Sequence, residues 1–185
     1  PTPELLLSWG PTPGEFQAAA ELVAGMSVSQ QAGQVLVARY GSVESAADLV
    51  VDLHLGGVIV MGDNVASTEQ VREDIAAIQA AAGRPFPLVV GVDQEGGTVA
   101  RIGAPATAFP TLMTMGAARD ATLAERVARA SGDELRALGF TMVFAPVADV
   151  TTGPDDPTIG SRSASSASSK APAKPWSSTW VTCSA

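Results

Sequence analysis

The sequence is poor in cysteine, histidine and basic residues. Cys183 is its only cysteine, which excludes an intramolecular disulfide and a metal site built from several cysteines. Eleven Lys and Arg stand against nineteen Asp and Glu, so the formal net charge is −8 and the pI is near 4.5. Nucleic-acid binding depends on clustered Lys and Arg, and this balance therefore argues against a nucleic-acid partner.

Long apolar runs are missing as well. No stretch approaches the roughly 20 apolar residues that a membrane-spanning helix needs, so we predict no transmembrane segment. The chain has 46% hydrophobic residues and a length sufficient for one domain with a core. It starts at Pro1 rather than at Met, and we expect an upstream segment, such as a signal peptide, to have preceded it.

The most informative stretch is 88–97, with the sequence LVVGVDQEGG. Its apolar part shows no alternation, which is typical of a strand buried on both faces of a parallel sheet. Asp93 and Glu95 follow where this strand ends, and that is where α/β sheets and barrels place their ligand sites. Residues two apart on a strand share a face at about 6.6–7 Å. The two carboxylates could therefore act as the acid/base pair of a glycosidase, or they could bind a ligand.

Apolar periodicity and capping signals predict alternating strands and helices. The capping-box pattern, in which a Ser or Thr is followed three residues later by Gln or Glu, occurs at Ser27, Ser67 and Thr122. Strand–helix–strand alternation indicates a parallel sheet, either open and doubly wound or part of a (β/α)8 barrel. The expected helices span about 15–25, 28–38, 45–53, 67–83 and 122–139, and the expected strands span 58–61, 88–92 and 142–145.

Three further features have structural interpretations that we prefer. Gly96-Gly97 lacks the Gly-Lys-Ser/Thr of a phosphate-binding loop, so we interpret it as a turn. Asp149, Asp155 and Asp156 lack the spacing of a calcium loop, which favours capping carboxylates over a metal site. His54 is interpreted as a helix-end or core histidine. We therefore expect neither a metal nor another cofactor.

Six segments occur in unbroken order: Gly91–Gly97, Arg101, Phe109–Thr111, Gly132–Gly139, Phe144–Val150 and Pro157–Ser163. Together they resemble glycoside hydrolase family 3, and most closely its β-N-acetylglucosaminidase branch, which includes exported and lipoprotein members of actinobacteria. The resemblance covers 27–163 and implies an α/β fold that is the first half of a (β/α)8 barrel. It leaves 1–26 as a lead-in and 164–185 as a tail of different composition.

The resemblance also implies an activity and a set of binding residues. Members of this branch remove terminal, non-reducing β-linked N-acetylglucosamine with retention, through a covalent intermediate. By position, Asp93, Arg101 and Arg162 resemble the family's sugar-binding residues, and Glu95 becomes a structural hydrogen-bond acceptor. A carboxylate accepts two hydroxyl hydrogen bonds and a guanidinium donates in a fixed fork, which suits neighbouring oxygens of a pyranose. The natural substrate stays open between muropeptides, chitooligosaccharides and glycoconjugates. An exported or envelope-associated location is expected, with the cytoplasm as the alternative.

The family's catalytic residues have no counterpart in this chain. Family members use a downstream Lys-His motif, a loop histidine as acid/base and an aspartate nucleophile on a late strand. A complete barrel typically has about 250 residues. We therefore expect no catalytic residue here and no turnover by this chain alone. Residues 164–185 hold seven Ser, five Ala and no acid, and we interpret them as out-of-frame translation. A non-catalytic sugar-binding fragment and an inert truncation product remain as alternative functions.

Overall fold

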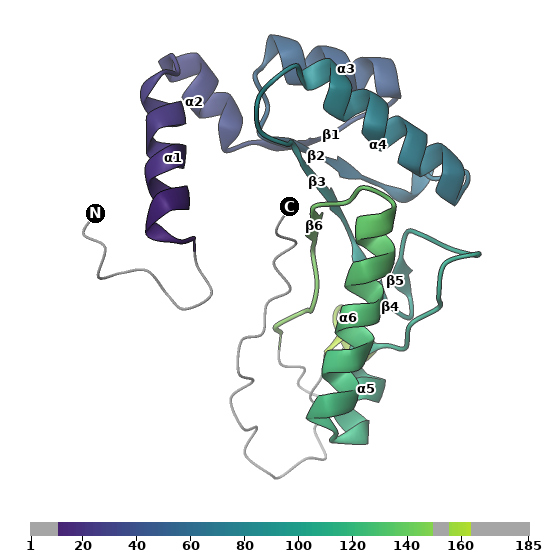
Figure 1. Ribbon diagram of the computed structural model, residues 1–185. Helices are drawn as coiled ribbons and strands as arrows, with labels where there is room; N and C mark the ends of the chain where they lie inside the picture. The colour runs from purple at the N-terminus through teal and green to yellow at the C-terminus, as the bar shows by residue number, and fades with distance from the viewer. Residues whose placement is uncertain (1–10, 150–155, 164–185) are drawn as a thin grey trace.

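A computed structural model describes residues 11–149 and 156–163 of the chain. Its centre is a four-stranded parallel sheet with the strand order β1-β2-β3-β6 (Figure 1). The α/β class with parallel strands, expected from the sequence, is confirmed. The strands are β1 (Val37–Arg39), β2 (Gly57–Val60), β3 (Val89–Val92) and β6 (Met142–Val143).

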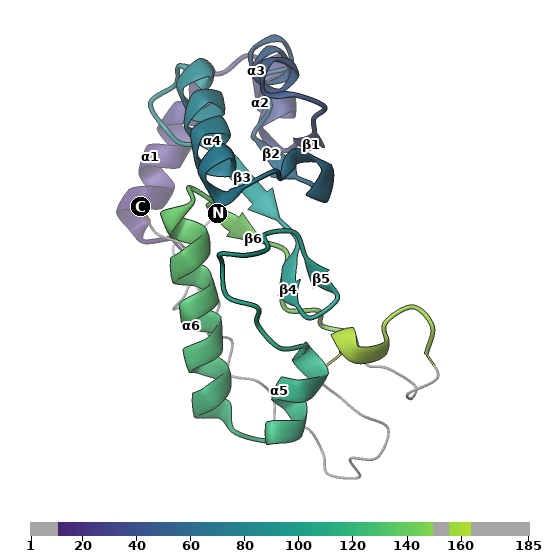
Figure 2. The ribbon, with the colours of Figure 1, turned by 90° about the vertical axis from the view of Figure 1, so that its right-hand side faces the viewer.

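Helices precede or connect these strands. Figures 1 and 2 show α3 and α4 side by side on one face of the sheet, while α1 and α2 extend away from it and α6 runs beside the end of β6. Within the described residues, no helix is long and apolar enough to span a membrane. The helices are α1 (Pro13–Ala24), α2 (Val28–Gln34), α3 (Val43–Asp52), α4 (Thr68–Ala82), α5 (Leu112–Ala118) and α6 (Ala121–Ala137), with short 3-10 turns η2 (Gly62–Asn64) and η3 (Gly160–Arg162).

The core lies between the sheet and the pair α3 and α4. Alternate residues of β2 and β3 are fully buried and meet apolar side chains that recur every three or four positions along α4. This packing fixes the register of the two central strands, in which Val58 pairs with Val90 and Val60 with Val92. The buried residues on the facing surfaces are Val58, Val60, Val90, Val92, Ala46, Val50, Val71, Ile75 and Ile78.

The predicted helix over 28–38 is wrong at its second half. The capping box at Ser27 is present, but α2 ends at Gln34 and Val37–Arg39 forms β1, paired with β2. Val28 and Val35 have the helical spacing that suggested a longer helix, yet both are 82% exposed. Because these side chains bury nothing in this part of the chain, their spacing gave no information on where the helix ends.

The segment over 94–119 contains structure that periodicity did not predict. β4 (Gln94–Gly96) and β5 (Val99–Ala100) form an antiparallel hairpin, and α5 follows it. The cap predicted at Thr122 is also wrong, because the carboxylate of Asp120 accepts from Leu123 N at 3.0 Å and caps α6. The capping box at Ser67 is confirmed at the start of α4.

Two predicted segments lie partly or wholly outside the described residues. In the lead-in over 1–26, α1 begins at Pro13, and no residue of this helix is buried. Residues 1–10 and the tail at 164–185 lie outside the described residues, as does Asp155.

Candidate functional site

The parallel strands bring their carboxyl ends to one edge of the sheet, and the candidate site lies there. Asp93 directly follows β3, and η2 begins one residue after the end of β2, beyond Met61. The β4–β5 hairpin continues from Asp93 and lies beyond the tip of β3 (Figure 2). Gly96 ends β4 and Gly97 begins the turn, with positive φ angles of 90° and 61°, in line with the turn predicted for this pair.

The first pair of charged side chains at this edge is Asp93 and Arg101. Arg101 Nη2 lies 3.5 Å from Asp93 Oδ2, and both side chains are partly exposed. The stem of Arg101 lies over η2, since a Cβ placed on Gly62 would be 3.7 Å from Arg101 Cδ. Among the described residues no acceptor reaches the buried Nε of Arg101. This pair therefore presents a carboxylate and a guanidinium side by side at the sheet edge.

Gln94, between the two acids, holds the backbone that carries Arg101. Its Oε1 accepts from Arg101 N at 2.7 Å and from Ile102 N at 3.0 Å, while its Nε2 donates to Ile102 O at 3.0 Å. The residue is 8% exposed. We assigned Gln94 no role from the sequence. Apart from its position between Asp93 and Glu95, nothing in the sequence distinguishes it from other glutamines.

The second pair is Glu95 and Arg162, which lie 67 positions apart in the sequence. Arg162 Nε donates to Glu95 Oε2 at 2.9 Å and Nη2 donates to Oε1 at 2.8 Å, a bidentate ion pair. The hydrogen bond and the charge of Glu95 raise the pKa of Arg162, and the charges of Asp149 and Asp93 act in the same direction.

The structure thus brings Asp93, Arg101 and Arg162 to the same edge. Asp93 contacts Arg101 directly, and its charge acts on Arg162. Glu95 is an acceptor for a guanidinium, in line with the structural role expected for it. Because both of its oxygens bind Arg162, Glu95 has no unengaged oxygen for proton transfer, and the geometry favours binding over an Asp93–Glu95 acid/base pair.

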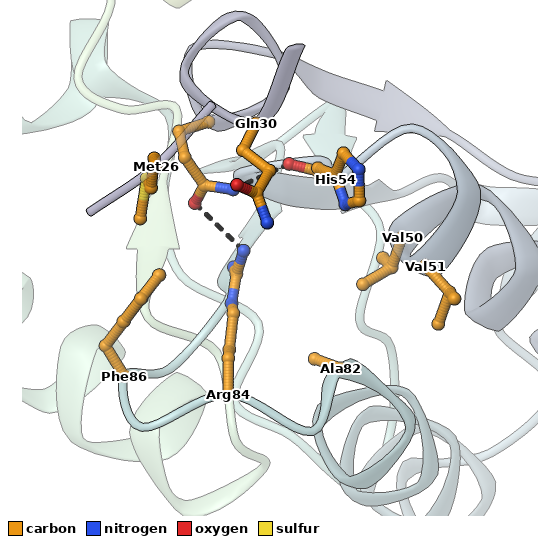
Figure 3. A pocket seen from close by; sticks show the side chains of 9 residues that line it. Met26, Gln30, Val50, Val51, His54, Ala82, Arg84 and Phe86 are labelled. Atoms are coloured by element: carbon orange, nitrogen blue, oxygen red, sulfur yellow. Dashed lines mark hydrogen bonds between the residues drawn. The ribbon is translucent and has the colours of Figure 1, made fainter. Parts of the chain in front are cut away.

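His54 lies before the start of β2, at the amino-terminal end of the strands and thus at the opposite end of the sheet from Asp93. It follows the end of α3 with a φ of 54°, as expected for a helix-end histidine. It helps to line a pocket of about 310 Å³, shown in Figure 3, together with side chains from α2, α3 and the segment before β3. Arg84 crosses this pocket and donates to Gln34 Oε1 at 2.9 Å and to the carbonyls of Leu55 and Gly56 at 2.9 and 3.0 Å. This arrangement ties three segments together.

One aspartate of the late loop, Asp156, accepts backbone hydrogen bonds. Asp156 Oδ1 accepts from Thr158 N and Ile159 N, both at 3.0 Å, which is the capping role predicted for it. In the described part of the chain, no group of three or more His, Cys, Asp or Glu side chains could hold a metal ion.

Comparison with known proteins decides the family. Residues 27–174 match the model of the family described as "Glycosyl hydrolase family 3 N terminal domain". The chain belongs to glycoside hydrolase family 3. It is 33% identical over 154 residues to the β-hexosaminidase LpqI of Mycobacterium tuberculosis, an alignment that covers 83% of this chain and 39% of LpqI.

Two solved structures of the family are also similar. A family 3 β-N-acetylglucosaminidase from Paenibacillus sp. has a TM-score of 0.73 and 37% identity, over 77% of this chain and 28% of that one. NagZ of Neisseria gonorrhoeae, in complex with N-trifluoroacetyl-D-glucosamine, has a TM-score of 0.61 and 28% identity, over 69% of this chain and 40% of NagZ. The chain therefore spans about two fifths or less of these family 3 proteins, and its sheet is part of the family's barrel domain.

Proposed function

We propose that this chain forms the sugar-binding wall of a family 3 β-N-acetylglucosaminidase, in which Asp93, Arg101 and Arg162 bind the terminal N-acetylglucosamine. The observation that supports this most strongly is the meeting of the three side chains at the carboxyl edge of the sheet, from segments up to about 70 positions apart. Family membership adds support, as does the bound amino-sugar derivative in the NagZ structure.

The chemistry of these side chains suits a sugar. A carboxylate accepts from two neighbouring hydroxyl groups, and guanidinium groups donate to hydroxyl and carbonyl oxygens. The local charge is also close to neutral, which suits an uncharged sugar ring better than a polyanion. The groups counted are two arginines and three carboxylates: Arg101, Arg162, Asp93, Glu95 and Asp149. In the whole protein, hydrolysis would proceed with retention through a covalent intermediate, using a nucleophile and an acid/base that the family places in its later segments.

Binding and hydrolysis can be tested separately on the 185-residue chain. Saturation-transfer NMR with N-acetylglucosamine should show binding, and Asp93→Ala should weaken it by about tenfold or more, because a charged acceptor of hydroxyl groups is lost. Glu125→Ala is the matched control, since Glu125 also pairs with an arginine, Arg129, but on the exposed surface of α6. Equal binding by the wild-type chain and Asp93→Ala would contradict the proposal.

Turnover is measured with a chromogenic N-acetylglucosaminide. We expect no hydrolysis by the 185-residue chain, whether or not it binds the sugar. Measurable hydrolysis that Asp93→Ala abolishes would show that this chain is a complete catalyst and that the assignment of catalysis to later segments is wrong.

A further inference from the structure

Glu95 stands out at the sugar site because it is buried and fully engaged. Its side chain is 8% exposed, and each of its two carboxylate oxygens accepts one hydrogen bond from Arg162. The acid comes from β4, the strand that directly follows Asp93, whereas the arginine comes from η3, much later in the chain. The ion pair therefore joins the late segment to the central hairpin.

The way in which the pair forms determines which part of Arg162 remains available. A guanidinium has five N–H groups, and Glu95 takes the Nε–H and one Nη2–H, which lie on one side of the group. Within the part of the chain that the structure describes, the remaining N–H groups on Nη1 and Nη2 donate to no acceptor. These donors form the outer edge of the group, and two parallel N–H groups on that edge can bind two oxygens of one ligand.

η3 alone does not fix the direction of this edge. It is a single three-residue turn, and an arginine side chain on such a turn has many rotamers in solution. A partner that removes this freedom before the ligand arrives lowers the entropic cost of binding, because the arginine is already ordered.

We propose that Glu95 is a positioning residue that holds the guanidinium of Arg162 so that its Nη edge faces the bound sugar. This inference rests on the proposed function, because it assigns Glu95 a role in sugar binding without direct contact. Glu95 acts only through Arg162, and this distinguishes it from Asp93, which would accept hydroxyl groups itself.

The ion pair can be observed directly by NMR of the full 185-residue chain. In a ¹H–¹⁵N spectrum, the Arg162 Nε–H should exchange slowly with water and lie apart from those of exposed arginines, with Arg162→Lys providing its assignment. Glu95→Gln should move this resonance to the position of the Nε–H resonances of exposed arginines. Glu125→Gln should leave it unchanged, because Glu125 pairs with Arg129 at the surface. An Arg162 resonance that stays in place in Glu95→Gln would overturn the proposal.

Sugar titrations test the role in binding. Glu95→Gln should weaken N-acetylglucosamine binding about tenfold. Losses of this size are typical when a residue that orients a metal-binding side chain is replaced, and Glu95 would orient Arg162 in the same way. Combining Glu95→Gln with Arg162→Ala should give no further loss beyond Arg162→Ala alone, since Glu95 acts through that arginine. Losses that add, or unchanged affinity in Glu95→Gln, would overturn the proposal while leaving the sugar site in place.

Two controls keep the outcomes distinct. A dispersed amide spectrum shows whether Glu95→Gln is folded. If it is not, Glu95→Asp keeps the charge but shortens the side chain by one methylene, so that it cannot reach both Nε and Nη2 of Arg162 as Glu95 does, and it should give the same loss. Absence of sugar binding by the wild-type chain would refute the proposed function and with it the role of Glu95. The Arg162 resonance would then still report whether the ion pair exists.

Discussion

At the residue scale, Tyr40 provides a probe of the fold. It is the only tyrosine in the chain, and 5% of it is exposed. Burial, together with the charges of Asp74 and Asp63, raises its pKa from about 10 to about 12. Between these two values the unfolded chain loses the proton first, so the free energy of unfolding should fall as the pH rises.

This prediction is checked by the ultraviolet absorbance of tyrosinate during an alkaline titration. The midpoint should lie near pH 12 in the folded chain and near pH 10 in urea, and Tyr40→Phe should abolish the signal. Tyr40→Phe should also remove this contribution to the alkaline loss of stability. Equal midpoints in the folded and unfolded chains would show that Tyr40 is accessible to water.

Gln94 is a second residue whose effect can be predicted, and Gln79 is its matched control. Each side-chain amide both donates to and accepts from a backbone segment: Gln94 holds Arg101 and Ile102, whereas Gln79 holds Leu88 through bonds of 2.9 and 3.1 Å. Either change to Ala should lower the free energy of unfolding by about 1–3 kcal/mol, because backbone polar groups lose their partners.

Only one of the two changes should affect the sugar site. Gln94→Ala loosens the backbone of Arg101, so it should weaken N-acetylglucosamine binding, whereas Gln79→Ala should not. Urea unfolding gives the stabilities, and the NMR titration gives the affinities. If the two variants lost affinity equally, general destabilisation would explain the effect, and a specific role for Gln94 would be refuted.

At the scale of elements, the sequence predicted those that are long enough to show a period. α4 is an example: Val71, Ile75 and Ile78 recur at helical spacing, and all three are buried against the sheet. The central strand β3 was evident for a related reason, since an unbroken apolar run that ends in acids fits a strand covered on both faces.

Four short elements, β1, β4, β5 and α5, were missed because they are held by individual contacts. β1 has three residues, too few to show alternation, and its partner is β2 rather than anything local. The β4–β5 hairpin depends on the glycine turn and on Gln94, and α5 is capped by Thr111, whose hydroxyl accepts from Thr114 N. None of these contacts leaves a periodic pattern in the sequence.

The candidate site shows the same division. From the family resemblance we predicted sugar-binding roles for Asp93, Arg101 and Arg162, and parallel-strand geometry explains why a residue that follows β3 lies at the carboxyl edge of the sheet. The pairing of Glu95 with Arg162 could not be predicted, because one sequence contains no signal that links positions 67 apart. Only the folded chain shows which carboxylate takes which guanidinium.

At the scale of the whole molecule, the main feature is that the two outer strands of the sheet, β1 and β6, each have an unpaired edge among the described residues. Among the described residues, β1 pairs only with β2 and β6 only with β3, so each outer strand has one edge without a strand partner. Apolar side chains lie next to both edges: Val35 and Leu36 precede β1, and Phe144 follows β6, and all three are exposed. A parallel sheet is normally covered on both faces, and unpaired edges beside apolar surface promote association.

We therefore expect the isolated chain to self-associate as its concentration rises, as measured by sedimentation velocity. Val35→Lys should lower the association constant about tenfold, because a buried Val contributes about 1.5–3 kcal/mol to an interface and a lysine at a strand edge opposes pairing. Leu123→Lys is the control, since Leu123 is an exposed apolar residue on α6, a helix that is not adjacent to β1 in the sequence. Sedimentation as a single monomer at all concentrations, or equal effects of the two substitutions, would contradict association through the β1 edge.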